Sequence, residues 1–406
     1  MEWKKLSQLV ERKICYGIVQ PGKGKNGNIP VIKVNNIISG LKSITELDTT
    51  THEIASKFQR TQLFGGEIVV SVVGSVGNTA IVPSSFKGCN LVRATAMVDI
   101  KDKVLATYVM YYFKTHEAQK YIESRLNTTV QATLNIKDLE EMPIPILQSS
   151  IILRLVSILS ALDAKIENNN KINANLEAQA QALFKSWFVD FTPFKDQPFV
   201  DSELGPIPQG WKVGKLGDYC EVKSGYAFKS SWWTNKGYKI IKIKNISENG
   251  DINLNDCSCV LPENCDKAKN FIANTGDIVI AMTGATIGKF NIIPKIDEKF
   301  YINQRVGKFF LGEKPIEKVP YIYCFLKQEN ISTQIIQKGQ GSAQPNISGA
   351  DIESIPMLTP MSIILKYNKM CQPLFEKILS NRLESKKLSA LRDTLLPKLM
   401  SGEIKL

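Results

Sequence analysis

The chain has 406 residues, more than one ordinary hydrophobic core accommodates, so two or more domains are expected. Hydrophobic residues make up 43% of the chain and charged residues 22%, which is typical of a folded protein and excludes a disordered polyelectrolyte. Lysine and arginine number 51 against 39 acidic residues, and the net charge of +12 favours a polyanionic partner such as nucleic acid, although a merely basic protein stays possible.

Neither a secretory leader nor a membrane-spanning segment is expected from the hydropathy pattern. Met1 to Lys5 leads directly into polar sequence, and the most apolar stretch, 144–162, is interrupted by Gln148 and Arg154, so it falls short of the ~20 apolar residues that span a bilayer. The eight cysteines are scattered, without the spacing of a disulfide framework. These patterns favour a reducing cytoplasm.

The chain repeats itself. The segment 66–74, Gly-Glu-Ile-Val-Val-Ser-Val-Val-Gly, is matched by 276–284, Gly-Asp-Ile-Val-Ile-Ala-Met-Thr-Gly. Four further pairs match in the same order: 30–37 with 239–246, 74–77 with 284–288, 108–114 with 321–327, and 135–143 with 346–356. Chance does not produce five collinear matches, so an internal duplication is predicted.

Each half shows the same order of elements. Alternating Val and Ile runs punctuated by Gly, Asn and Pro predict a β-rich segment. One helix follows, at about 105–126 and about 319–338, and then a short extended segment at the Met-Pro or Ile-Pro pair. A long helix closes each half, at about 151–190 and about 362–400.

The long helices carry a heptad pattern, which predicts a seam facing a partner helix. Both seams contain an asparagine in the same position, Asn169 and Asn381, and we expect these two side chains to face each other and fix the register. The alternative is that each seam packs on its own domain. The seam positions are Leu155, Leu159, Leu162, Ile166, Asn169, Asn173, Leu176, Ala180, Leu183 and Trp187 in the first helix, and Leu374, Ile378, Asn381, Ser385, Leu388, Arg392, Leu395 and Leu399 in the second.

Four prolines between Phe191 and Trp211 predict a stiff connector. The predicted fold class is α+β, with two similar β-rich domains separated by two long helices that form an antiparallel coiled coil with a pseudo-two-fold axis. A helix of ~38 residues is ~55 Å long, enough to place two domains one DNA turn of ~34–36 Å apart. The predicted boundaries are 1–148 for the first domain, 149–192 for the first helix, 193–210 for the linker, 211–358 for the second domain and 359–406 for the second helix.

Catalytic motifs are hard to find. The two histidines, His52 and His116, have no second ligand or nucleophile beside them, and the cluster of Cys257, Cys259 and Cys265 has no fourth ligand nearby. Surface positions for the histidines and no metal site are therefore expected.

The glycine-rich segments do not fit nucleotide binding either. The segment 22–27 matches GxGxxG, but a proline-containing strand follows it in place of a helix, so a mobile basic loop is predicted. The segment 284–289 is one residue short of a P-loop and lacks the Ser or Thr after its lysine. No Asn-Pro-Pro-aromatic or Asp-Pro-Pro-aromatic motif for amino methylation is present. We expect a chain without catalysis, cofactor or metal of its own.

The sequence resembles the specificity subunits of type I restriction–modification enzymes over essentially its whole length. The resemblance is carried by the segment from Glu203 to Trp211, the segment from Ser224 to Ser230, the Gly-Asp-Ile-Val-Ile stretch with its glycine turn, and Asn346-Ile347 before Ile355-Pro356. The first half departs from the pattern, because it lacks Ser-Gly-Tyr-Ala-Phe-Lys and has the basic glycine loop near that place.

The resemblance implies two target recognition domains, each of which reads half of a bipartite, asymmetric site in double-stranded DNA. The helices would set the unread spacer and dock two modification subunits, which would carry S-adenosylmethionine and methylate adenine. Restriction (motor-nuclease) subunits would join for cleavage, with ATP and Mg also on partner subunits.

Residues at strand ends and in loops supply donors and acceptors for bases and cations for phosphates. In the first half the predicted DNA-contacting residues are Lys23, Lys25, Asn26, Lys33, Asn35, Asn36, Ser71, Ser75, Asn78 and Arg93. In the second half they are Tyr226, Lys229, Ser230, Lys242, Lys244, Asn245, Thr283, Thr286, Lys289, Gln304, Arg305, Gln340 and Ser342.

Two other functions compete with this one. A self-sufficient methyltransferase or nuclease would methylate or cut DNA as the purified chain alone. A protein-only scaffold built on the coiled coil would bind its partner without regard to DNA sequence, and would lack the steep loss of affinity that a DNA reader shows as salt rises.

Overall fold

The computed structural model describes residues 2–25, 27–38, 40–41, 43–127, 131–247, 252–340 and 345–404. The chain divides into two compact units. The first unit comprises Met1–Ala164 with Leu388–Leu406, and the second comprises Lys165–Lys387. Each unit therefore contains a β-rich domain and parts of both long helices.

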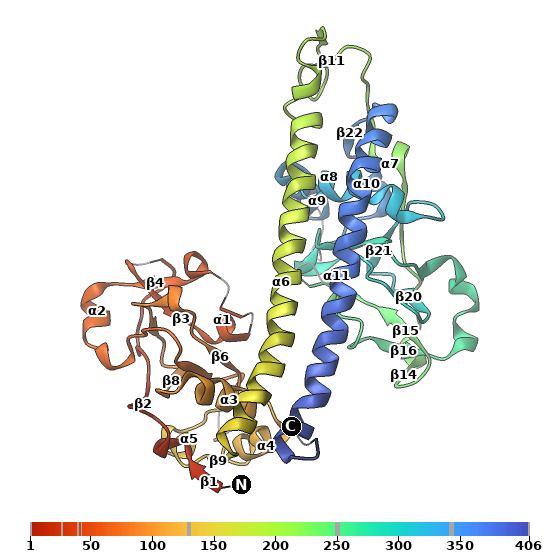
Figure 1. Ribbon diagram of the computed structural model, residues 1–406. Helices are drawn as coiled ribbons and strands as arrows, with labels where there is room; N and C mark the ends of the chain where they lie inside the picture. Colours follow the sequence, from red (N-terminus) through yellow and green to blue (C-terminus); the bar gives the residue numbers. More distant parts are fainter. Residues whose placement is uncertain are drawn as a thin grey trace. The chain divides into compact units, whose positions relative to one another are not determined.

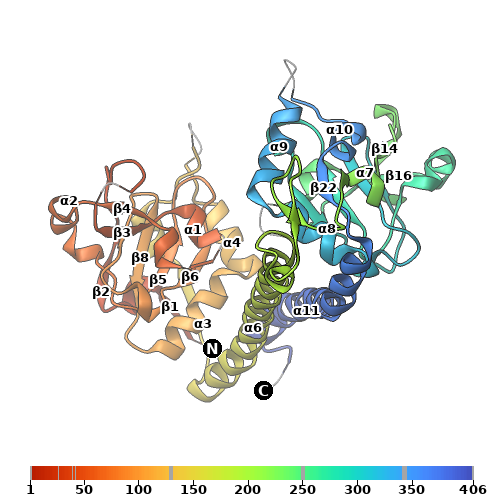
Figure 2. The same ribbon diagram turned by 90° about the horizontal axis from the view of Figure 1, so that it is seen from above.

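The first unit is built on two main sheets. A four-stranded antiparallel sheet has the order β2-β8-β5-β6, and a three-stranded sheet has the order β4-β3-β7, in which β3 and β7 run parallel. Figure 2 shows β3 and β4 side by side. The strands are β1 (Glu2–Lys5), β2 (Arg12–Tyr16), β3 (Ile29–Ile32), β4 (Asp48–Thr50), β5 (Ile68–Ser71), β6 (Thr79–Ile81), β7 (Asn90–Leu91), β8 (Thr95–Asp99) and β9 (Pro143–Ile146), which pairs with β1.

The second unit repeats this topology. Its four-stranded sheet has the order β13-β21-β18-β19, and its other main sheet, β14-β16-β15-β20-β17, again contains a parallel pair, β15 with β20. The strands are β12 (Val213–Lys215), β13 (Glu221–Ser224), β14 (Trp233–Thr234), β15 (Tyr238–Ile241), β16 (Ser258–Val260), β17 (Ile272–Ala273), β18 (Ile278–Ala281), β19 (Phe290–Ile292), β20 (Phe300–Ile302), β21 (Val306–Phe310) and β22 (Pro356–Leu358), which pairs with β12. The internal duplication is therefore confirmed at the level of strand order.

The helix predicted at about 105–126 is two helices, so that prediction is wrong in its length. The Thr115 hydroxyl accepts a hydrogen bond from the backbone N of Ala118 at 3.3 Å, which starts a new helix. The second half is interrupted at the same place. The shorter helices of the first unit are α1 (Val34–Ile38), α2 (His52–Ser56), α3 (Lys103–Phe113), α4 (His116–Glu123) and α5 (Ile136–Glu140); those of the second are α7 (Leu216–Tyr219), α8 (Val319–Leu326), α9 (Glu329–Gly339) and α10 (Gly349–Glu353).

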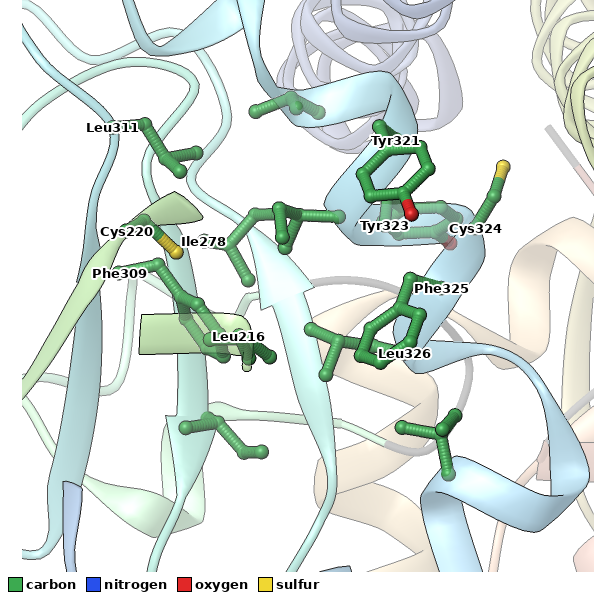
Figure 3. Close-up of a cluster of buried hydrophobic side chains, with 14 of the residues drawn as sticks. Leu216, Cys220, Ile278, Phe309, Leu311, Tyr321, Tyr323, Cys324, Phe325 and Leu326 are labelled. Carbon is green, nitrogen blue, oxygen red and sulfur yellow. The ribbon is translucent and has the colours of Figure 1, made fainter. Parts of the chain in front are cut away.

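Helix α8 packs on the four-stranded sheet of the second unit to form its main core. Figure 3 shows Tyr321, Phe325 and Leu326 of α8 beside Ile278 of β18 and Phe309 of β21. All eight residues of α8 are buried, because this helix lies between the sheet and the long helices.

The two long helices are α6 (Ser149–Phe188) and α11 (Met361–Ser401), and Figure 1 shows them running side by side. Within the second unit the Asn381 side chain donates to Asn173 at 2.9 Å, and the Tyr367 hydroxyl donates to the carbonyl of Ala180 at 2.8 Å. Residue numbers rise along α6 as they fall along α11, so the pair is antiparallel. The predicted coiled coil is confirmed.

The two seam asparagines are both buried, but their hydrogen bonds run diagonally. Asn169 donates to Ser385 at 3.3 Å and to Glu384 at 2.8 Å, while Asn381 donates to Asn173. Asn173 lies four residues after Asn169, and Ser385 lies four residues after Asn381. Each seam asparagine is therefore hydrogen-bonded to a residue that lies one helical turn past the other seam asparagine. The expected face-to-face pair is thus displaced by one helical turn.

Each long helix also enters the core of both units. In the first unit, Leu155 and Leu159 of α6 share a buried cluster with Leu396 and Leu399 of α11. In the second unit, Phe184 and Phe188 of α6 share a cluster with residues of α11 that include Tyr367 and Phe375. The alternative that each seam packs on its own domain therefore holds only near the start of each helix. The end of each helix enters the core of the other unit, and the middle of the seam pairs helix with helix.

The linker after α6 forms a short hairpin of β10 (Phe199–Val200) and β11 (Ile207–Pro208). Phe191 lies three residues after the end of α6 and has a positive φ of 51°. Its ring lies 5.5 Å from that of Trp211, which also contacts Phe188 at 5.9 Å. This aromatic packing holds the connector on the second unit.

Candidate nucleic-acid interface

Strand ends from both main sheets converge at one edge of the second unit. The backbone N of Asn303 donates to the carbonyl of Ile241 at 3.0 Å, and that of Gln304 to Tyr226 at 3.0 Å. The backbone N of Met282 donates to Arg305 at 3.0 Å. We call this the strand-end edge; its residues are Tyr226, Lys242, Thr283, Gln304 and Arg305.

The first unit has the same edge, built by the same backbone hydrogen bonds. Val92 donates to Ile32 at 3.2 Å, Arg93 donates to Ile18 at 2.7 Å, and Val72 donates to Ala94 at 2.9 Å. The residues of its strand-end edge are Ile18, Lys33, Val73, Arg93 and Ala94. Two units thus present one backbone arrangement with different side chains.

A glycine makes the close approach at each edge possible. A Cβ atom on Gly225 would lie 2.2 Å from the carbonyl oxygen of Ile302, and one on Gly17 would lie 2.1 Å from that of Leu91. Gly17 is therefore the counterpart of Gly225, and the first half keeps the glycine of the segment that it was expected to lack. Sequence reasoning missed Gly17 because nothing around it resembles the neighbours of Gly225.

The two lysines that follow β15 are held by aromatic, hydroxyl and acidic neighbours. The Lys242 Nζ lies 3.4 Å from the centre of the Trp233 ring and donates to Ser258 Oγ at 2.9 Å. Burial, with Lys244 nearby, lowers the pKa of the Lys242 ammonium. Lys244 pairs with Asp256 at 2.9 Å.

The aromatic segment after β13 is split between surface and interior. Lys229 and Ser230 are exposed, and the Lys229 ammonium lies 5.3 Å from the Trp232 ring. Tyr226 is half-buried, with its ring 5.0 Å from that of Phe228. Tyr226 therefore reaches the edge from the hydrophobic interior.

The glycine turns after β5 and β18 use several of the predicted residues for their own shape. Ser71 is buried; its hydroxyl donates to the Ser75 carbonyl at 2.6 Å and accepts from the Asn78 backbone N at 2.9 Å. The Thr286 hydroxyl donates to the Thr283 carbonyl at 3.3 Å. Ser75 is exposed, whereas Asn78, Thr283, Thr286 and Lys289 are half-buried.

In each half, one of the residues predicted to contact DNA stabilises the turn that follows a strand. The Asn36 side chain accepts from the backbone N of Lys33 at 2.8 Å, and Asn245 accepts from Lys242 at 2.9 Å. Asn245 is buried, with its amide also donating to the carbonyl of Asn253 at 2.9 Å. Asn245 and Ser71 therefore shape the loops from inside the protein.

The remaining predicted residues lie mostly at the surface. Lys33 forms an ion pair with Asp48, and the Lys25 ammonium donates to the Thr45 carbonyl at 3.0 Å. Lys23, Lys25, Asn35, Arg93, Gln304, Arg305 and Gln340 are exposed. Asn26 and Ser342 lie outside the described residues.

Within the described ranges, no group of three or more His, Cys, Asp or Glu side chains is placed to hold a metal ion. His52 and His116 are exposed residues that open α2 and α4. All eight cysteines are free thiols, and no helix in the described ranges is long and apolar enough to cross a membrane. The fold and the edges define a duplicated protein, in which each unit presents the same strand-end edge.

Known proteins resemble the chain over both halves. The family model described as type I restriction modification DNA specificity domain matches residues 1–178 and 208–366. The chain is 31% identical over 312 residues to the MjaIX type I restriction enzyme specificity subunit of Methanocaldococcus jannaschii, covering 75% of this chain and 70% of that protein. It is 25% identical over 370 residues to the HindI specificity subunit of Haemophilus influenzae, covering 74% and 78%.

A solved structure shares the fold. The type I restriction–modification S subunit from M. genitalium matches with a TM-score of 0.55 at 18% identity, over 98% of this chain and 95% of that one. The chain belongs to the type I restriction modification DNA specificity family and is a specificity subunit, whose function is recognition of a DNA target.

Proposed function

We propose that the two units read the two halves of a bipartite, asymmetric DNA site, and that α6 and α11 set the unread spacer between them. One observation carries this proposal: the strand-end edge occurs twice, with the same backbone hydrogen bonds and with different exposed side chains. A repeated backbone supports the same docking on DNA, while different side chains support different sequences. The net charge of +12 suits the phosphate backbone.

The chain itself is proposed to be non-catalytic and cytoplasmic, with two modification subunits docked on it. S-adenosylmethionine is then held by those subunits, and restriction subunits with ATP and Mg join for cleavage. Exposed apolar residues repeat near the start of each long helix and support two equivalent docking places. Leu153 and Ile158 of α6 are 56% and 38% exposed, and Leu365 and Met370 at the matching positions of α11 are 63% and 56% exposed.

Lengthening both helices tests the proposal. Seven residues, one heptad, inserted after Asn173 in α6 and after Ser380 in α11 lie at the same level of the antiparallel pair, because Asn173 faces Asn381. They keep the seam in register and add ~10 Å, about three base pairs. We expect the adenine methylation map of the complex with its modification subunits to show the same two half-sites separated by a longer spacer. Changed half-sites with an unchanged spacer would contradict the proposal that the helices set the spacer. Methylation of DNA by the purified chain alone would favour a self-sufficient enzyme.

The basic residues after β15 give a second test. Replacing Lys242 and Lys244 by Ala is expected to weaken DNA binding of the complex at every sequence and to lower the slope of log affinity against log salt by about one per lost phosphate contact. Replacing Lys386 and Lys387 by Ala removes the same charge from the exposed face of α11 and serves as the control. Unchanged affinity and slope in the first variant would place this strand end away from DNA.

A further inference from the structure

Arg93 and Gln304 occupy the same position in the two strand-end edges. The backbone N of Arg93 donates to Ile18 at 2.7 Å, and that of Gln304 donates to Tyr226 at 3.0 Å. Ile18 and Tyr226 each follow the close-approach glycine, Gly17 or Gly225. The equivalence therefore rests on hydrogen bonds and not on sequence similarity, which is absent between these loops.

The neighbours on both sides confirm the match. Before Arg93, Val92 donates to Ile32, and before Gln304, Asn303 donates to Ile241. After them, the carbonyls of Ala94 and Arg305 accept from Val72 and Met282. The two loops connect equivalent strands, β7 to β8 and β20 to β21.

Both side chains are exposed and available to a ligand. Neither the guanidinium of Arg93 nor the amide of Gln304 makes a hydrogen bond or an ion pair within the described ranges of the chain. Lys33 and Lys242, by contrast, are the same residue type at the equivalent position directly after β3 and β15, and both are held by neighbours. The edge thus combines a shared cation with a position that differs between the units.

The chemistry of the differing position matches two different bases. An arginine fork donates two hydrogen bonds to O6 and N7 of guanine, whereas the glutamine amide donates to N7 and accepts from N6 of adenine. We propose that Arg93 reads a guanine in the half-site of the first unit and that Gln304 reads an adenine at the corresponding place in the half-site of the second. This inference rests on the proposed function, because it requires that each unit reads its own half-site.

Exchanging the two residue types tests the assignment. The complex with its modification subunits is prepared with Arg93→Gln or with Gln304→Arg, and methylated adenines are mapped. Arg93→Gln is expected to change guanine to adenine at one position of one half-site, and Gln304→Arg to change adenine to guanine at one position of the other. Discrimination at the affected position is expected to shift by roughly 5- to 150-fold, the range for one bidentate contact.

Arg93→Lys separates base reading from a phosphate contact, because lysine keeps the charge but lacks the fork. Lysine still reaches O6 and N7 of guanine, so base reading predicts weaker discrimination at the same position, whereas a phosphate contact predicts unchanged discrimination. A variant set that weakens binding equally at all sequences, or leaves the map unchanged, overturns the assignment and makes Arg93 a phosphate or solvent-facing residue. If the unaltered complex shows no two-part motif, the proposed function itself fails, which is a different result. Competition binding with oligonucleotides that vary only this base gives the same readout where a variant no longer methylates.

Discussion

Replacing Asp277 by Ala is expected to lower the free energy of unfolding of the second unit by about 3–5 kcal/mol, the usual cost of removing one partner from a buried ion pair. The Asp277 and Lys308 side chains are 2% and 6% exposed, and their charged atoms lie 2.6 Å apart. Burial raises the pKa of the Asp277 carboxyl despite the ammonium beside it. Without Asp277, the Lys308 ammonium would keep the Ile272 carbonyl, at 2.8 Å, and the Phe310 ring, whose centre lies 5.3 Å away.

Hydrogen exchange of the backbone amides of β18 and β21 in the full chain measures this loss, because it reports the opening of one unit separately from the other. The matched control replaces both partners, Asp277→Leu with Lys308→Met. Since apolar pairs of similar volume usually restore or exceed the stability of a buried ion pair, we expect most of the loss to disappear in this double variant. A loss below about 1 kcal/mol in Asp277→Ala would show that the ammonium finds water or another partner.

Replacing Phe188 by Ala is expected to cost the second unit about 3–5 kcal/mol, because it opens a cavity at the centre of an aromatic cluster. The Phe188 ring lies 4.9 Å from Tyr321, 5.5 Å from Tyr367 and 5.1 Å from Phe184. Phe188 belongs to α6, so the substitution detaches the end of this helix from α8. Exchange of the α8 amides should rise while that of the α3 amides in the first unit stays unchanged.

Val189→Ala is the control for that experiment. Val189 follows Phe188 directly and is 48% exposed, so its truncation should change stability by no more than about 0.5 kcal/mol. Equal effects of the two substitutions would mean that the end of α6 is not part of the second core.

The duplication, the α+β class and the antiparallel long helices were all predictable from the sequence. Repeated apolar spacing is a local property, and the buried positions Leu155, Leu159 and Asn169 fall where the heptad places them. The break at Thr115 was not foreseen, because a threonine inside an apolar helical pattern shows its capping role only through the backbone it bonds. The one-turn displacement of Asn169 and Asn381 depends on the packing of two helices together and has no local signal.

The strand-end edge is the part that sequence reasoning could indicate but not assemble. Its residues are joined by hydrogen bonds between segments far apart in the chain, such as Arg305 with Met282 and Gln304 with Tyr226. Polar character near a strand end predicted DNA contacts for the exposed Arg93 and Gln304. It predicted the same role for Ser71 and Asn245, which are buried. Burial separates a side chain that faces a ligand from one that supports a turn, and burial depends on the fold.

The entry of both long helices into both cores bears on how the chain is made. Leu396, Leu399 and Met400 complete a cluster whose other buried residues all lie before Ala164. During synthesis the ribosome adds these three residues only after the entire second unit has been translated. Domains generally fold as units from the N-terminus onward. In this chain, however, the apolar surface of the first domain is fully covered only after the end of α11 has been synthesised. The nascent first half is thus exposed to aggregation for most of translation, and a premature stop near the end would damage the half that was synthesised first.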